Sequence, residues 1–227
     1  MTAQRAMKAG ANRRGLMLAR RWRAQLAEQA TPRRQALAGL ALLALLAWPA
    51  LHQYLQASMW RHMLLQYLLW MAAGALLAPA IPPRMRGAIA RCNAHGLSGL
   101  VFTAVVLAVL MVPRVLDLAL REPAIDLAKC AALVLAGSAL RLSWPAATPV
   151  VQGFFLGNLL PMTFVVGQLY LESPLRLCNA YLLDDQARLG RWLSGLAVLL
   201  ALAWLLRVGW RLARPDAPRE TAAGRRA

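Results

Sequence analysis

Long apolar runs alternate with short polar and proline-rich stretches along most of the chain. Each run is long enough to predict a helix that crosses a bilayer. The runs cover about 37–57, 59–82, 97–113, 125–144, 149–171 and 191–213. Boundaries fall near prolines, which cannot donate an amide to a helix: Pro82, Pro83, Pro113, Pro145 and Pro149. The pattern predicts an all-α, polytopic membrane helix bundle with about six transmembrane helices, of which the first two form a tight hairpin.

Polar flanks divide the chain into three parts. Residues 1–36 form a basic arm with nine Lys/Arg and one acid, Glu28. Residues 37–213 form the transmembrane bundle, and residues 214–227 form a basic tail. Residues 13–29 of the arm fit an amphipathic helix on an anionic membrane surface, and they equally fit a solvated basic segment.

Basic residues between the runs predict the orientation of the bundle. The two termini, the 83–96 loop and Arg141 together hold 19 Lys/Arg, whereas the opposite side holds seven. That opposite side also carries six of the nine acids. Because positive residues favour the cytoplasmic side, both termini are predicted to be cytoplasmic, in a multi-pass protein of the inner (plasma) membrane.

Composition and motifs exclude several classes of function. A chain with 59% hydrophobic and 15% charged residues is too apolar for a soluble domain. The net charge of +17 does not indicate nucleic-acid binding, because the basic residues flank apolar runs and no reading module is present. Cys92, Cys130 and Cys178 form no disulfide framework and no zinc motif. No phosphate loop, nucleophile elbow or paired-carboxylate arrangement is visible, so we expect no enzymatic activity.

Four polar or sulfur-bearing side chains share one helix face at the start of the second run. Met59, His62, Met63 and Gln66 follow the spacing i, i+3, i+4 and i+7. Thioether, thiol and imidazole groups favour Cu(I). The spacing by itself is more typical of a helix–helix contact capped by polar groups.

The predicted topology brings further donors to this outer end of the bundle. The metal-binding residues that we expect are His62, Met63, Met59, Cys130, Asp117 and Asp185, with copper as the cofactor. His95 lies at the cytoplasmic end, so a haem held between His95 and His62 is not expected.

Several short motifs, in their order along residues 59–210, resemble the CtaG-like (caa3-type) cytochrome c oxidase assembly factors. Residues 62–69 (HMLLQYLL) are similar to the family's H-M-x-x-Q-H motif, with Tyr67 in place of the second His. Residues 113–120 (PRVLDLAL) resemble the family's P-x-L-Y-D-x-A-L. Lys129 or Cys130 stands near a fourth-span His of the family, and Asp185-Gln186 with Gly190 resembles its D-Q-x-x-G element.

The resemblance implies a multi-span protein associated with copper insertion into haem–copper oxidases. Several family histidines are absent here, at Tyr67 and around Met111 and Cys130. Two functions follow: copper delivery to an oxidase subunit, with ligands shifted toward Met and Cys, or a metal-free scaffold or accessory subunit of a respiratory complex. A transporter is disfavoured because no run carries an acid at mid-depth.

Overall fold

The computed structural model describes residues 31–213, and this part of the chain is helical with no strand. The basic arm before residue 31, including the amphipathic helix considered for residues 13–29, and the tail after residue 213 lie outside the described residues. Four helices are long and apolar enough to cross a membrane, or up to six if each of two bent pairs counts as one span. The sequence prediction of an all-α bundle of spans is thereby confirmed.

Prolines start many of the helices. α2 (Pro32–Ala47), α3 (Pro49–Gln56), α5 (Pro83–Cys92), α7 (Pro113–Arg121), α8 (Pro123–Ser143) and α9 (Pro149–Glu172) each begin on a proline. The first turn of a helix has no partner for its amides, so proline is tolerated there. Thr31 and Thr148 cap α2 and α9 through their hydroxyl groups.

The second span changes helix type along its length. It consists of the π-helix η1 (Arg61–Gln66), α4 (Tyr67–Leu77) and the 3-10 turn η2 (Ala78–Ala80). The remaining elements are the short turn η3 (Ala94–Gly96), α6 (Leu97–Leu110) and α10 (Leu183–Leu212). Pro161 lies inside α9 without ending it.

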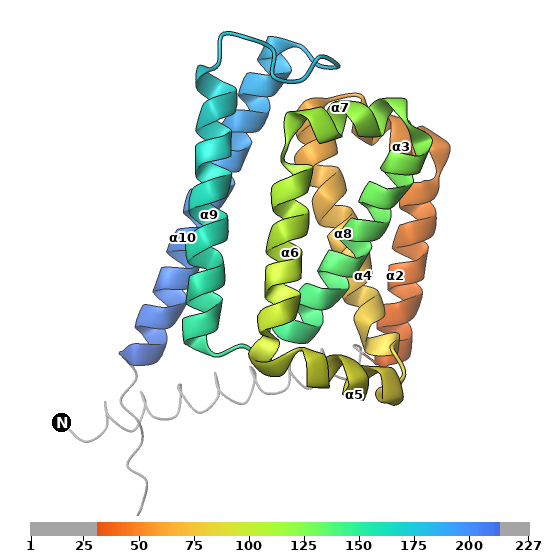
Figure 1. Ribbon diagram of the computed structural model, residues 1–227, viewed down its shortest axis with the longest axis vertical. Coiled ribbons are helices and arrows are strands. Elements are labelled where there is room, and N and C mark those ends of the chain that lie inside the picture. Colours follow the sequence, from red (N-terminus) through yellow and green to blue (C-terminus); the bar gives the residue numbers. More distant parts are fainter. Residues whose placement is uncertain (1–30, 214–227) are drawn as a thin grey trace, which may run out of the picture.

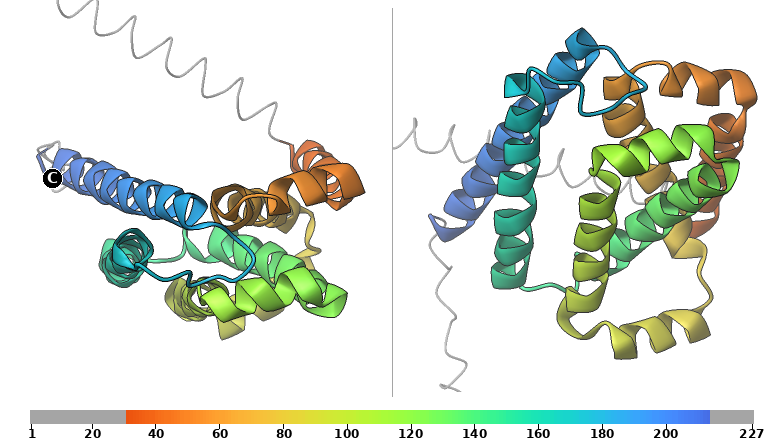
Figure 2. Two further views of the ribbon diagram at one scale, coloured as in Figure 1. Left: turned by 90° about the horizontal axis from the view of Figure 1, so that it is seen from above. Right: turned by 45° about the horizontal axis from the view of Figure 1, so that its top comes forward.

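The spans stand side by side, and two short helices lie across their ends (Figure 1). α7 crosses one end and α5 crosses the other, and we call these the α7 end and the α5 end. α2 bends into α3 by 72° at Trp48-Pro49, and α5 bends into α6 by 68°. Gly96 has a φ of 72° at the second bend, a conformation that glycine adopts without strain. Figure 2 shows α9 and α10 as a pair beside the other spans.

Three segments differ from the sequence prediction. Residues 83–92 and 113–121 are helices (α5 and α7) although we expected loops, and α10 begins at Leu183, eight residues before the predicted start of the sixth span. α7 has apolar residues on one side, Leu116 and Ala119, which are buried. Such short amphipathic stretches are shorter than a membrane span, so the long apolar runs that indicate spans do not reveal them.

Backbone contacts hold the central pair of helices together. A Cβ atom on Gly74 of α4 would collide with the backbone of Val134, and one on Gly137 of α8 would collide with the backbone of Met71. Ser138 donates a hydrogen bond of 2.8 Å to the carbonyl oxygen of Gly74. Small residues therefore set the α4–α8 distance, as is common between membrane helices. In contrast, a Cβ on Gly157 of α9 would meet nothing within 4 Å.

Candidate functional site

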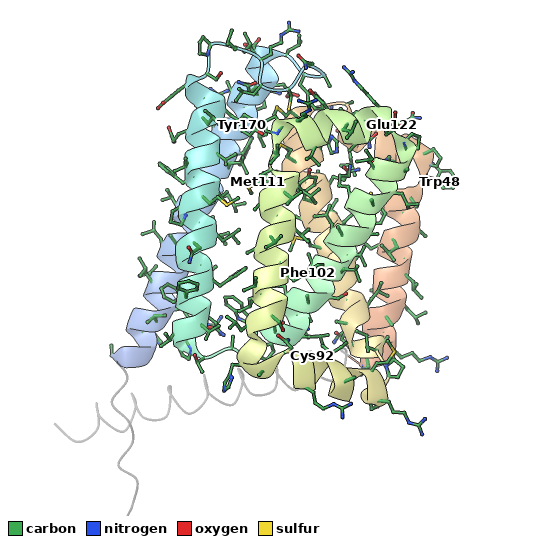
Figure 3. All side chains as sticks on the ribbon, viewed as in Figure 1. Trp48, Cys92, Phe102, Met111, Glu122 and Tyr170 are labelled. Atoms are coloured by element: carbon green, nitrogen blue, oxygen red, sulfur yellow. The ribbon has the colours of Figure 1, made fainter. Side chains whose placement is uncertain are left out.

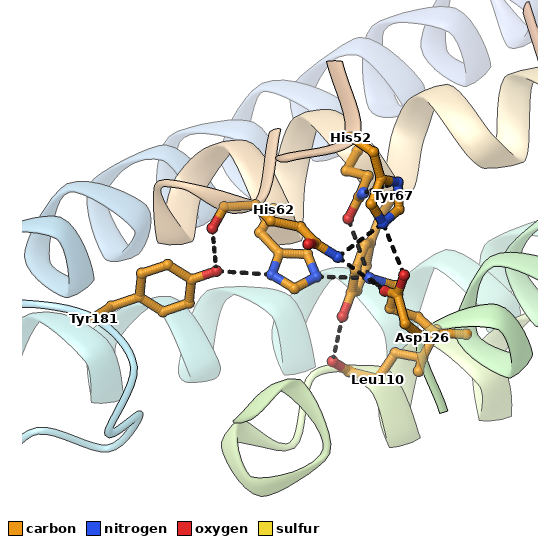
Figure 4. Close-up of polar contacts among 9 residues, drawn as sticks. His52, His62, Tyr67, Leu110, Asp126 and Tyr181 are labelled. Atoms are coloured by element: carbon orange, nitrogen blue, oxygen red, sulfur yellow. Dashed lines mark hydrogen bonds and ion pairs between the residues drawn. The ribbon is translucent and has the colours of Figure 1, made fainter. Parts of the chain in front are cut away.

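A buried polar network at the α7 end joins α3, η1, α8 and the loop of residues 173–182 (Figure 4). Its centre is His62, whose exposed fraction is 0%. His62 Nδ1 lies 2.8 Å from the Tyr181 hydroxyl, and His62 Nε2 lies 2.7 Å from Lys129 Nζ. Both ring nitrogens therefore have protein partners.

The hydrogen bonds assign the tautomer of His62. The Tyr181 hydroxyl donates to the carbonyl oxygen of Gln56 at 2.7 Å, so it receives a proton from His62 rather than giving one. Nδ1 then carries the proton, and Nε2 keeps the lone pair that accepts from the Lys129 ammonium. That lone pair is the one a metal ion would use.

Lys129 uses all three of its ammonium protons. Besides His62 Nε2, Nζ contacts Asp126 Oδ1 at 2.7 Å and Gln66 Oε1 at 3.2 Å. The side chain is 1% exposed. A buried charge is costly unless it is paired and hydrogen-bonded, and here three acceptors surround the ammonium group. Lys129 is therefore held rigidly beside His62.

Asp126 connects this centre to α3. Its Oδ2 lies 2.7 Å from His52 Nε2, and its Oδ1 accepts from Gln56 Nε2 at 3.0 Å. Gln66 Nε2 lies 3.4 Å from His52 Nδ1, which closes the network. Asp126 and Lys129 thus place opposite charges 2.7 Å apart at the centre of the network.

The loop after α9 is held so that Tyr181 reaches His62. The Asp117 carboxylate accepts from the amides of Asn179 at 2.9 Å and Ala180 at 3.3 Å. Gln186 Oε1 accepts from the amide of Leu177 at 2.9 Å. Burial raises the pKa of Tyr181, with the nearby Cys178 adding to the effect. The hydroxyl therefore stays protonated and continues to donate to Gln56.

The other predicted metal ligands have separate partners. Asp185 accepts hydrogen bonds from the hydroxyl of Ser58 at 2.7 Å and from the amide of Met59, so it ties α10 to the start of the second span. Asp117 binds the loop, as described above. Met63 Sδ lies 3.8 Å from the Tyr170 hydroxyl, which donates to the carbonyl oxygen of Met111 at 3.2 Å. Neither carboxylate is bonded to His62.

The soft donors lie in the apolar core. Met59, Met63 and Cys130 are buried at 0%, 5% and 5% exposure and belong to one hydrophobic cluster. Within residues 31–213, no three His, Cys, Asp or Glu residues are grouped so that they could hold a metal ion. The arrangement around His62 does not fit the copper site that the resemblance implies, because the Lys129 ammonium occupies the metal-binding side of the ring.

Sequence reasoning missed most of the network around His62. His52, Asp126 and Tyr181 are 10, 64 and 119 residues away in the chain, and the order of the helices was not predictable. One signal was available. Asp126 and Lys129 are spaced i, i+3 near the start of an apolar run, and ionisable residues at such a place usually face a partner inside the bundle.

Comparison of the chain with protein families, with curated proteins and with solved structures found no match.

Proposed function

We propose that this chain is a scaffold of the inner (plasma) membrane that supports assembly of a respiratory haem–copper oxidase without itself carrying metal or catalysing a reaction. The order of sequence motifs supports the partner class, by resemblance alone. One observation carries the metal-free part of the proposal: Lys129 Nζ lies 2.7 Å from the only unprotonated nitrogen of His62.

The chemistry of this contact opposes a bound cation. A metal at His62 Nε2 would have to displace an ammonium group that also pairs with Asp126 at 2.7 Å. It would then lie beside a positive charge in a buried setting, where charge repulsion is strong. The network instead fixes α3, η1, α8 and the 173–182 loop in one arrangement, as a docking platform requires.

Copper delivery is the second candidate, and one observation favours it. The thioethers of Met59 and Met63 and the thiol of Cys130 are buried in the same apolar cluster. Soft sulfur ligands suit Cu(I). This candidate predicts that the sulfur atoms, rather than the shape of the side chains, are needed.

Complementation of a host strain that lacks the chain separates the two candidates. Met59→Leu with Met63→Leu removes both sulfur atoms and nearly conserves volume. The scaffold proposal expects this double variant to restore assembled oxidase, measured by its haem absorbance and copper content, as well as the unsubstituted chain does. It also expects that copper added to the medium does not replace the chain.

Three outcomes contradict the proposal. Loss of oxidase copper in the double variant, or recovery of the deletion strain by added copper, would favour copper delivery. An unchanged oxidase content in the deletion strain would remove the oxidase as partner.

A further inference from the structure

A large apolar cavity separates the α9–α10 pair from α4, α6 and α8. Its volume is about 600 Å³, within the range of ligand pockets. Leu68 and Leu200 line it and are also 51% and 45% exposed, so the cavity opens sideways at the protein surface. In a membrane, that opening faces lipid.

The cavity has an apolar end and a charged end. Met63 and Met111 line it toward the α7 end, and Arg141 and Trp144 line it toward the α5 end. In Figure 3, Met111 lies toward the space between α6 and α9, and Cys92 lies at the α5 end. Arg141 lies in the last turn of α8, two residues before Ser143, which accepts a hydrogen bond from Asn93 in the α5–α6 connection.

The cavity is long enough for an acyl chain. Along the second span its lining runs from Met63 to Ala75, twelve residues further on. This corresponds to about 18 Å of helix axis, compared with about 15 Å for half of the hydrocarbon core. The cavity thus extends from Arg141 at the α5 end to Met63, which is next to His62 in the chain.

The α5 end is suited to an anionic headgroup. The Arg141 side chain is exposed and, within residues 31–213, has no protein hydrogen bond or ion pair. Trp144 and Phe155 form an edge-to-face pair with ring centres 6.3 Å apart, and aromatic side chains favour the membrane–water boundary. α5 adds exposed Arg84 and Arg91 at the same end. Basic pockets between membrane helices bind phospholipid headgroups.

We propose that the cavity binds one acyl chain of an anionic phospholipid from the leaflet at the α5 end, with the lipid phosphate at Arg141. The bound lipid joins the α9–α10 pair to the remaining helices. This inference is independent of the scaffold proposal, because it concerns neither metal nor oxidase.

Native mass spectrometry of the full chain in mild detergent, with phosphatidylglycerol and phosphatidylcholine added in turn, tests the site. The expected result is one retained phospholipid, with phosphatidylglycerol preferred. Leu156→Trp fills the cavity and should abolish retention. Val150→Trp, on the same helix but 80% exposed and outside the cavity, is the matched control and should retain the lipid.

Arg141→Gln tests the headgroup contact without altering the packing of the core. The preference for phosphatidylglycerol should fall about fivefold, whereas Arg207→Gln, an exposed arginine that does not line the cavity, should leave it unchanged. The proposal is overturned if the unsubstituted chain retains no lipid, or retains a molecule other than a phospholipid. It is also overturned if the folded Leu156→Trp variant retains lipid as the unsubstituted chain does, or if Arg141→Gln keeps the full preference for phosphatidylglycerol.

Discussion

Lys129 Nζ lies 2.7 Å from His62 Nε2, and the two residues are brought together from helices that are 67 positions apart in the chain. The contact uses the ring nitrogen through which His62 would bind a metal ion. It is part of a hydrogen-bonded network of ionisable and polar groups inside an apolar bundle.

Removal of the Lys129 charge should be costly. Lys129→Met leaves the Asp126 carboxylate and His62 Nε2 without their Lys129 partner. Breaking a buried pair in this way should lower the unfolding free energy by about 3 kcal/mol. This value is the lower end of the usual range, because Asp126 is 19% exposed. Equilibrium unfolding in mixed micelles measures the change. The double variant Asp126→Leu/Lys129→Met should cost less than the sum of the two single variants, and strict additivity would contradict the pairing.

Asp185 should matter more than its neighbour Asp184. Asp185→Asn weakens the bonds to the Ser58 hydroxyl and the Met59 amide, with a loss of about 1–3 kcal/mol of unfolding free energy. Asp184→Asn is the matched control, since this exposed carboxylate takes no part in those bonds. Equal effects of the two substitutions would show that the tie between α10 and the second span is unimportant.

The α4–α8 contact should not tolerate a methyl group. Gly137→Ala forces the two backbones apart and should destabilise the protein by about 1–3 kcal/mol. Gly157→Ala on α9 meets nothing within 4 Å and should instead stabilise it by about 0.5–1 kcal/mol. Thermal unfolding in detergent distinguishes the two, and destabilisation by both to the same degree would contradict the packing described.

The thiol of Cys178 should resist alkylation. Burial, with a smaller contribution from Asp117, raises its pKa from 9.0 to about 12, so the reactive thiolate is scarce at pH 8. Its contribution to stability is fully present below pH 9 and is lost as the pH rises toward 12. Exposed Cys92 is the internal control. Peptide mapping after maleimide treatment should find Cys92 modified first, and equal rates would contradict the burial of Cys178.

The sequence predicts the spans because each apolar run is long and the prolines sit at helix starts, where they are tolerated. It does not predict the partners of His62. Those depend on which helices are neighbours, and apolar faces can pack in several ways. Tyr181 lies in a loop whose position is set by the Asp117 carboxylate, and that carboxylate was expected to bind metal rather than backbone amides.

Cu(I) binding to the purified full chain in detergent, under reducing conditions and against a competing chelator, tests the metal-free account most directly. The unsubstituted chain is compared with His62→Ala and with the control His95→Ala, which changes the histidine of η3 near the α5 end. The account predicts no binding above that of empty micelles in any of the three proteins. Tight, near-stoichiometric binding would contradict it, and loss of that binding in His62→Ala alone would show that copper displaces Lys129 from His62.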